Sequence, residues 1–396
     1  MSRQSDLAFA HNERLISISD LLAKRMRRLW SQMDLRDLNG SWAQVAPRMV
    51  AQVNAAQMSA ASLSAPYLNA IDRSYRYNPI PASITPAAFS NVMEDGREVG
   101  PALFGGVTNT KTLIGRGMAP AMAFQVGANF VAVVASAALH SAAQNADRVL
   151  TIGKGYTRYI RVVNGSACSR CAILAGMYSA EEAFQRHISC QCGTAPIQME
   201  GKAKTPAGFH DSPQAYFDSL SAAEQDRRFT VAGAQAIRDG ADPIRIVNAR
   251  RGANGIGYSG HRGAPILDRS RRIEKVTIGY RPNGTAIRVY ATAEGSTVRG
   301  EFGRQELQTG RAQMRAGARY VSTARVRLMP ESIIQIAGDN TALRQAFLRD
   351  AGYLDYVPRH GYDNGGKWIQ EIRDMRAADR ILVNRATARY GNFYLG

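Results

Sequence analysis

The feature that most constrains this chain is a cluster of potential metal ligands near its middle. All four cysteines of the 396-residue sequence fall between Cys168-Ser-Arg-Cys171 and Cys190-Gln-Cys192, and His187 precedes the second pair. A Cys-x2-Cys turn lets two thiolates reach one ion, and sulfur together with imidazole completes the tetrahedron typical of structural zinc. Five candidates compete for four positions. We therefore expect a structural zinc site that omits Cys190 or Cys192, because an i, i+2 pair points the same way only on a strand.

Other uses of the cysteines remain open. Two disulfide bonds would require an oxidising compartment, and the segment MSRQSDLAFAHNERLIS at the start holds no apolar core of a secretion signal. A redox pair would open a helix after a strand in a βαβ unit, whereas Cys168 follows a strand-and-turn pattern. A catalytic zinc keeps one position for water, and here the ligands are oversupplied. The pattern favours a structural metal.

The residues around the cluster also carry a family resemblance. GSACSRCAILAG at Gly165–Gly176, followed by FQRHISCQC at Phe184–Cys192, resembles the signature of Mu F-like minor head proteins of tailed phages, in the version found in phages of actinobacteria. Ile188 stands where these proteins usually have proline, a difference that leaves the ligand spacing intact. Further blocks are similar to those downstream of the metal site in the same proteins: Ala234–Asp242, Val247–Gly252, Thr292–Gly300 and Arg327–Glu331.

The resemblance implies a structural minor head protein that contributes to head assembly and to DNA packaging or ejection. It places the chain inside the capsid, and in the host cytoplasm during assembly. The implied partners are the portal protein, the major capsid or scaffold protein, and packaged double-stranded DNA, with no membrane in the assembled head. Some members of the family are capsid maturation proteases and others carry toxin domains, so an enzyme is the alternative. The six histidines stand in no nucleophile–base pattern, and we expect no catalytic residue.

Hydrophobic periodicity predicts an α+β, mainly α, protein in three parts. Residues 1–150 are expected to form a helical domain, 151–200 a small zinc-stapled strand and loop unit, and 201–396 a basic α+β region. The stretch Gly117–Ala146 holds 11 alanines and no formal charge with His140 neutral. It predicts one long core helix from about Pro120 to Val149 rather than a membrane span, since alanine contributes little to insertion.

Shorter patterns predict the remaining elements. The helices expected there are at Ala180–Arg186, Ala234–Arg238, Asn340–Arg349 and Lys367–Arg385. We expect a strand at Tyr156–Val163 and a β-hairpin from Ile273–Tyr280 and Ala286–Thr292 across an Asn-Gly turn.

The charge of the chain is large and uneven. The net charge is +18, and the segment Arg245–Arg327 holds 17 basic and 5 acidic residues. Such an excess favours a polyanion, either DNA bound without sequence preference or an acidic protein surface. The candidate nucleic-acid contacts are Arg250, Arg251, Arg262, Arg269, Arg271 and Arg272.

Overall fold

The computed structural model shows an α+β, mainly helical protein, as predicted. It describes residues 2–163, 167–182, 184, 190–198, 205–250, 276–280, 284, 286–292, 294, 301–308, 310, 312–314, 316–317, 321–323, 327–354, 378 and 381–383. The chain divides into two compact units, unit 1 (Met1–Tyr216) and unit 2 (Phe217–Gly396). The finer division at residues 150 and 200 stays a prediction.

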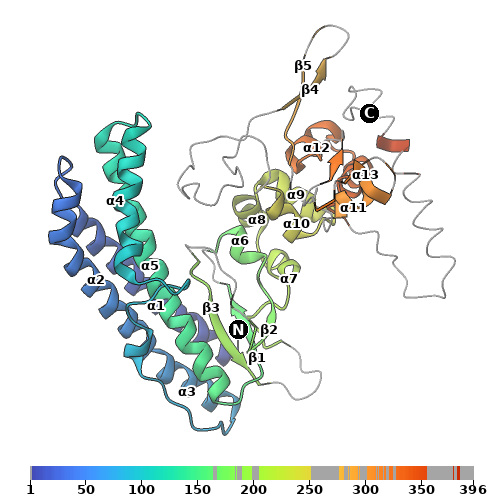
Figure 1. Ribbon diagram of the computed structural model, residues 1–396. Helices are drawn as coiled ribbons and strands as arrows, with labels where there is room; N and C mark the ends of the chain where they lie inside the picture. Colours follow the sequence, from blue (N-terminus) through green and yellow to red (C-terminus); the bar gives the residue numbers. More distant parts are fainter. Residues whose placement is uncertain are drawn as a thin grey trace. The chain divides into compact units, whose positions relative to one another are not determined.

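Unit 1 is built around one long helix, α5 (Pro120–Gly153), which confirms the predicted Ala-rich helix and extends past Val149. Helices from the first part of the chain pack against α5, as Figure 1 shows. They are α1 (Arg3–Trp30), α2 (Leu38–Ser62), α3 (Ser64–Tyr75) and α4 (Val99–Gly115), with the 3-10 helix η1 (Pro86–Phe89) between α3 and α4.

Small residues let α4 and α5 approach each other beside Trp30. A Cβ added at Gly127 of α5 would lie 2.1 Å from Thr110 Oγ1 and 2.6 Å from Trp30 Cζ2. At Gly106 of α4 it would meet the same indole ring at 3.0 Å. The ring is buried, and its Nε1 donates a hydrogen bond to the Phe124 carbonyl oxygen at 3.0 Å. The indole therefore fills the space that the two glycines leave.

We expect Gly127→Ala to destabilise unit 1 by about 1–3 kcal/mol, because the added methyl overpacks the contact with Trp30 and Thr110. In an unhindered helix alanine is more favourable than glycine by about 1 kcal/mol. A loss of stability in Gly127→Ala would therefore identify overpacking as the cause. Gly115→Ala in α4 is the matched control, since a Cβ there meets nothing within 4 Å. Urea unfolding measures both variants. An unfolding midpoint for Gly127→Ala equal to that of the native chain would contradict this close packing.

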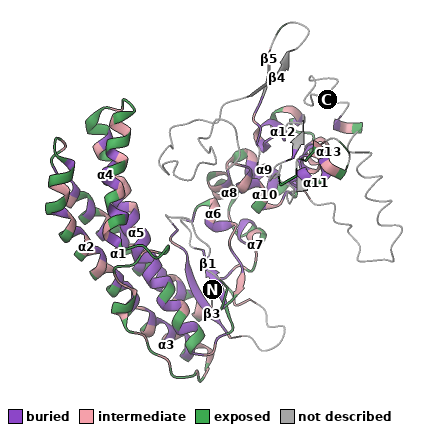
Figure 2. Ribbon diagram, in the orientation of Figure 1, coloured by how far each residue is buried: buried purple, intermediate pink, exposed green. Residues whose placement is uncertain are grey.

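Helix α5 is the one helix, among the described residues, whose length and composition would suit a membrane span. In its most apolar window 56% of the residues are buried inside the protein. Figure 2 shows this burial along the helix, where it faces its neighbours. Two of its buried polar side chains bond to other parts of unit 1: Asp147 pairs with His11 at 3.2 Å, and Gln144 donates to a carbonyl oxygen. These features agree with the predicted core helix.

A small antiparallel sheet completes unit 1. Its strands are β1 (Arg158–Val162), β2 (Met177–Ser179) and β3 (Gly193–Ile197), in the order β2-β1-β3. Strand β1 confirms the predicted strand, and β3 is buried along its whole length (Figure 2). Apolar side chains of α3 and of the end of α5, among them Leu68, Ile71 and Leu150, pack with Ile160 of β1.

Between β2 and β3 the predicted helix at Ala180–Arg186 is not seen in the described residues, because Ala180–Glu182 form a turn and bend after β2. Residues 183 and 185–186 of that prediction lie outside the described part of the chain.

The described residues of unit 2 form short helices and two antiparallel pairs of strands. Its elements are α8 (Ala222–Phe229), α9 (Val231–Arg238), α10 (Pro243–Ala249), β4 (Val276–Tyr280), β5 (Ala286–Val289), α11 (Glu301–Gln308), β6 (Ala312–Gln313), β7 (Ser322–Thr323), α12 (Pro330–Ala337) and α13 (Thr341–Asp350). The boundary between the units falls in α7 (Pro213–Asp218). A buried ion pair joins α13 to the end of α9, with Arg344 Nε 2.6 Å from Asp239 Oδ2.

Several predictions for unit 2 are confirmed. Strands β4 and β5 pair antiparallel as the predicted hairpin, and α9 and α13 cover the helices predicted at Ala234–Arg238 and Asn340–Arg349. Of the helix predicted at Lys367–Arg385, only residues 378 and 381–383 are described, and they are helical.

Candidate metal centre

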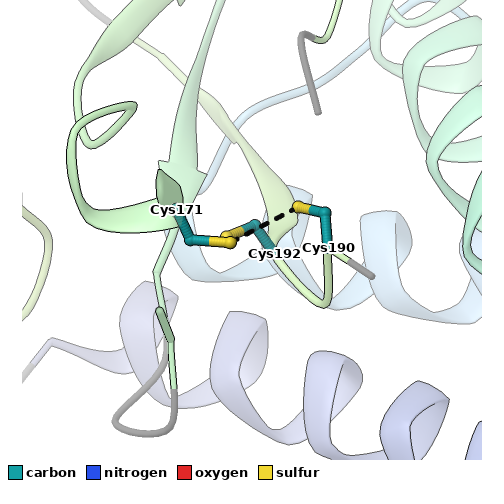
Figure 3. A group of neighbouring side chains, drawn as sticks. All are labelled: Cys171, Cys190 and Cys192. Carbon is teal, nitrogen blue, oxygen red and sulfur yellow. Dashed lines mark hydrogen bonds between the residues drawn. The ribbon is translucent and has the colours of Figure 1, made fainter. Parts of the chain in front are cut away.

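Three cysteines from two separate segments converge beside the sheet of unit 1. Cys171 lies in the short helix α6 (Ser169–Ala172), and Cys190 and Cys192 lie in the segment that leads into β3. The three sulfur atoms lie within 4.8 Å of one another, and all three residues are buried. Figure 3 shows the side chains pointing toward a common centre. The sequence prediction of a cysteine cluster is confirmed to this extent.

The spacing of the sulfur atoms suits a tetrahedral ion. Sulfurs bound at about 2.3 Å to one tetrahedral zinc lie about 3.8 Å from each other. In this structure Cys171 Sγ lies 3.7 Å from Cys190 Sγ and 3.8 Å from Cys168 Sγ. A disulfide would bring two sulfurs to about 2.05 Å, and all four cysteines are free thiols. The residues present therefore fit a metal ion better than a disulfide.

The fourth ligand has two candidates. Cys168 is exposed and approaches Cys171, but it is not part of the group of three that share one centre. His187 lies outside the described residues. Cys190 and Cys192 both reach the centre, because the chain between them does not follow a regular strand or helix. The geometry therefore does not select between them, although the i, i+2 spacing suggested that one would be left out.

Electrostatic interactions act differently on the three thiols. The Cys171 thiol donates a hydrogen bond to the Cys190 sulfur, which holds the pKa of the Cys190 thiol well below its ordinary value. The Arg161 guanidinium, with Nη2 3.3 Å from Cys190 Sγ, acts in the same direction. Burial opposes the charge of Arg161, but the sulfurs of Cys192 and Cys190 outweigh it and raise the pKa of Arg161. The pKa of the Cys171 thiol is raised, chiefly by its hydrogen bond with Cys168. Cys171 lowers the pKa of the Cys192 thiol, but the hydrogen bond with Cys190 and burial outweigh this effect and raise it to about 12. The thiolate, which is the form that binds metal, is therefore favoured at Cys190 and not at the other two cysteines.

Hydrogen bonds connect the segment 190–194, which carries two of the cysteines, to the helices of unit 1. Gln144 of α5 donates from Nε2 to the Cys192 carbonyl oxygen at 2.6 Å. Tyr67 of α3 donates from its hydroxyl to the Thr194 carbonyl oxygen at 2.9 Å. The Tyr67 ring stacks on His11 of α1, with centroids 4.1 Å apart. The cysteine cluster is therefore held against the helices of unit 1 and does not form a separate small domain.

The sequence did not single out Arg161 or Gln144 as parts of the site. Arg161 stands in a strand of aromatic and β-branched residues, and a charged residue at a buried strand position is the signal that marks it. Gln144 lies 48 residues before Cys192, and nothing in the local pattern relates the two.

Of the six arginines predicted to contact nucleic acid, Arg250 is the one that the structure describes. Its guanidinium pairs with Glu331 and donates to Thr230 Oγ1 at 2.9 Å. These contacts hold α10, α12 and the start of α9 together. The other five, Arg251, Arg262, Arg269, Arg271 and Arg272, lie outside the described residues.

These features define a mainly helical α+β protein whose small sheet carries a buried, sulfur-rich site able to hold a metal ion. The chain belongs to the VG15 protein family, a family of phage proteins, and the match spans residues 1–223, which include all of unit 1. No curated protein and no solved structure matches the chain.

Proposed function

We propose that this chain is a structural minor head protein of a tailed phage, of the Mu F-like kind found in phages of actinobacteria, and not an enzyme. Membership of a phage protein family supports a place in the virion. The observation that carries the structural role is the burial of the site, since Cys171, Cys190 and Cys192 are 3%, 2% and 2% exposed. A substrate would need an open coordination position reached from solvent, and closed sites of this kind stabilise folds.

The proposed metal is zinc. Three thiolates with a further sulfur or imidazole are the donor set of structural zinc sites, because soft sulfur ligands disfavour calcium and magnesium. Zinc bound there would supply no chemistry beyond holding α6 to the start of β3. Cys168 or His187 would complete the set.

The proposed location is the interior of the capsid, beside the portal. The helical unit 1 would provide the docking surface for the portal protein, with the major capsid or scaffold protein as a further partner. The basic segment Arg245–Arg327 would contact packaged double-stranded DNA without sequence preference, because it carries a net charge of +12 from 17 basic and 5 acidic residues. Arg250 is committed to Glu331, so we assign this contact to the other arginines of the segment.

Cross-linking of intact, DNA-filled particles of the encoding phage tests this proposal. We expect mass spectrometry to recover cross-links from unit 1 to the portal protein, and from unit 2 to DNA. External protease should leave the chain intact in whole particles and should digest it after the particles are opened. Empty heads prepared the same way are the control for the DNA contact, since the protein cross-links should persist there.

Two results would contradict the proposal. Absence of the chain from purified heads would rule out a head protein. A gene deletion that changes the N-terminus of the major capsid protein, measured by intact mass, would point to the maturation protease alternative. A structural role predicts an unchanged capsid protein and a loss of infectious particles.

A further inference from the structure

Arg161 is a buried cation placed against the cysteine cluster. It lies on β1, the middle strand of the sheet, and is 3% exposed. Its Nη2 lies 3.3 Å from Cys190 Sγ, and its Cζ lies 4.1 Å from the centre of the Phe184 ring. Arg158 on the same strand is exposed, and its Nη1 lies 3.8 Å from the Met177 sulfur. One strand thus carries a buried arginine at the site and an exposed arginine away from it.

A buried guanidinium stays charged, so it requires negative charge nearby. The sulfurs of Cys192, Cys190 and Cys171 are the groups that stabilise the charge of Arg161 electrostatically. Neutral thiols would offset the burial of a full charge only weakly, whereas thiolates on a metal offset it well. A divalent ion with three thiolates carries one negative charge if His187 is the fourth ligand and two if Cys168 is, and one guanidinium cancels one of these charges.

We propose that Arg161 is the counter-charge of the metal centre: by neutralising the thiolate-bound ion from inside the sheet, it raises the affinity of the cysteine cluster for zinc. This inference rests on the proposed zinc site. Arg161 is a positioning and charge-balancing residue and binds no metal itself. Groups of this kind, which contact ligands rather than the ion, typically change metal affinity by about 10–100-fold.

The test compares Arg161→Met, Arg161→Lys and Arg158→Met with the native full-length chain. Zinc affinity is measured by competition with a chromophoric chelator. We expect Arg161→Met to bind zinc about 10–100-fold more weakly, Arg161→Lys to recover most of the affinity because it keeps the charge, and Arg158→Met to match the native chain. Cobalt substitution should give the same sulfur-to-cobalt absorption per bound ion in all four proteins, since the ligands are unchanged.

A second readout separates charge balance from simple packing. Zinc-loaded Arg161→Met should lose more stability than metal-free Arg161→Met, because weaker zinc binding lowers the stability of the loaded form alone. A packing role predicts equal losses of stability with and without zinc. If Arg161→Met fails to fold, Arg161→Gln, which removes the charge and keeps a hydrogen-bond donor, carries the same expectations.

Zinc affinity of Arg161→Met within twofold of the native value would overturn the inference and leave the zinc site standing. Equal losses of affinity in Arg161→Met and Arg161→Lys would also overturn it, because charge would then not be the cause. A native chain that binds no zinc would instead overturn the zinc site on which the inference rests.

Discussion

Replacement of Cys171 by serine is expected to abolish metal binding and to destabilise unit 1 by more than about 4 kcal/mol, the range reached when a structural metal is lost. Cys171 is central to the cluster, since its sulfur lies within 4 Å of both Cys168 and Cys190. Structural zinc supplies about 10–16 kcal/mol of binding free energy in isolated zinc-finger peptides. Zinc content per chain and the thermal unfolding midpoint measure the two effects.

Ser169→Ala is the matched control, because Ser169 lies in the same short helix α6 and carries no sulfur that could bind the metal. It should keep one zinc per chain and the native midpoint. Chelation of the native chain should reproduce the loss seen in Cys171→Ser and expose thiols to titration. A native chain that is metal-free as purified and no less stable than its zinc-loaded form would contradict the structural metal.

Replacement of Asp72 by alanine is the second large effect, expected at about 3–5 kcal/mol, because it leaves a buried ammonium without its partner. Asp72 of α3 accepts from Lys154 Nζ at 2.7 Å and from the Tyr156 hydroxyl at 2.7 Å. The two side chains of the ion pair are 8% and 6% exposed. The three residues tie α3 to the point where α5 passes into β1. Urea unfolding of unit 1 measures the loss.

Two comparisons make this result specific. The double variant Asp72→Leu with Lys154→Met should recover much of the lost stability, since it removes both charges and keeps apolar volume. Asp34→Ala removes an ion pair with Arg36 whose side chains are 47% and 92% exposed, so its unfolding midpoint should not change. Equal midpoints for Asp72→Ala and the native chain would mean that this ion pair does not hold the junction.

Local patterns predicted the elements that local chemistry determines. Pro120 at the first turn and the alanines behind it were sufficient to predict α5, and the Asn-Gly turn was sufficient to predict the pairing of β4 with β5. The close spacing of the cysteines in the sequence likewise predicted that cysteine side chains meet at one site. Met177–Ser179, by contrast, is a strand only because it pairs with β1, so the sequence alone did not mark it.

Contacts between distant residues were outside the reach of the sequence. Asp72 and Lys154 are separated by 82 positions, and each is surrounded by residues that give no hint of the other. The same holds for Arg161. Its strand was predicted, but its role depends on its contact with Cys190, which belongs to a separate segment of the chain. Such pairs become visible only when the packing of helices and strands is known.

The order of the strands has a consequence for synthesis on the ribosome. β1 is the central strand, yet both of its neighbours, β2 and β3, follow it in the chain. The five helices α1–α5 are complete by Gly153, whereas the backbone of β1 lacks one row of partners until Gly193–Ile197 has emerged. Until then a nascent chain presents an open strand edge, which is the kind of edge that pairs with other chains. Cys190 and Cys192 emerge immediately before β3. Delivery of these two thiols and closure of that edge are thus successive steps late in the synthesis of unit 1.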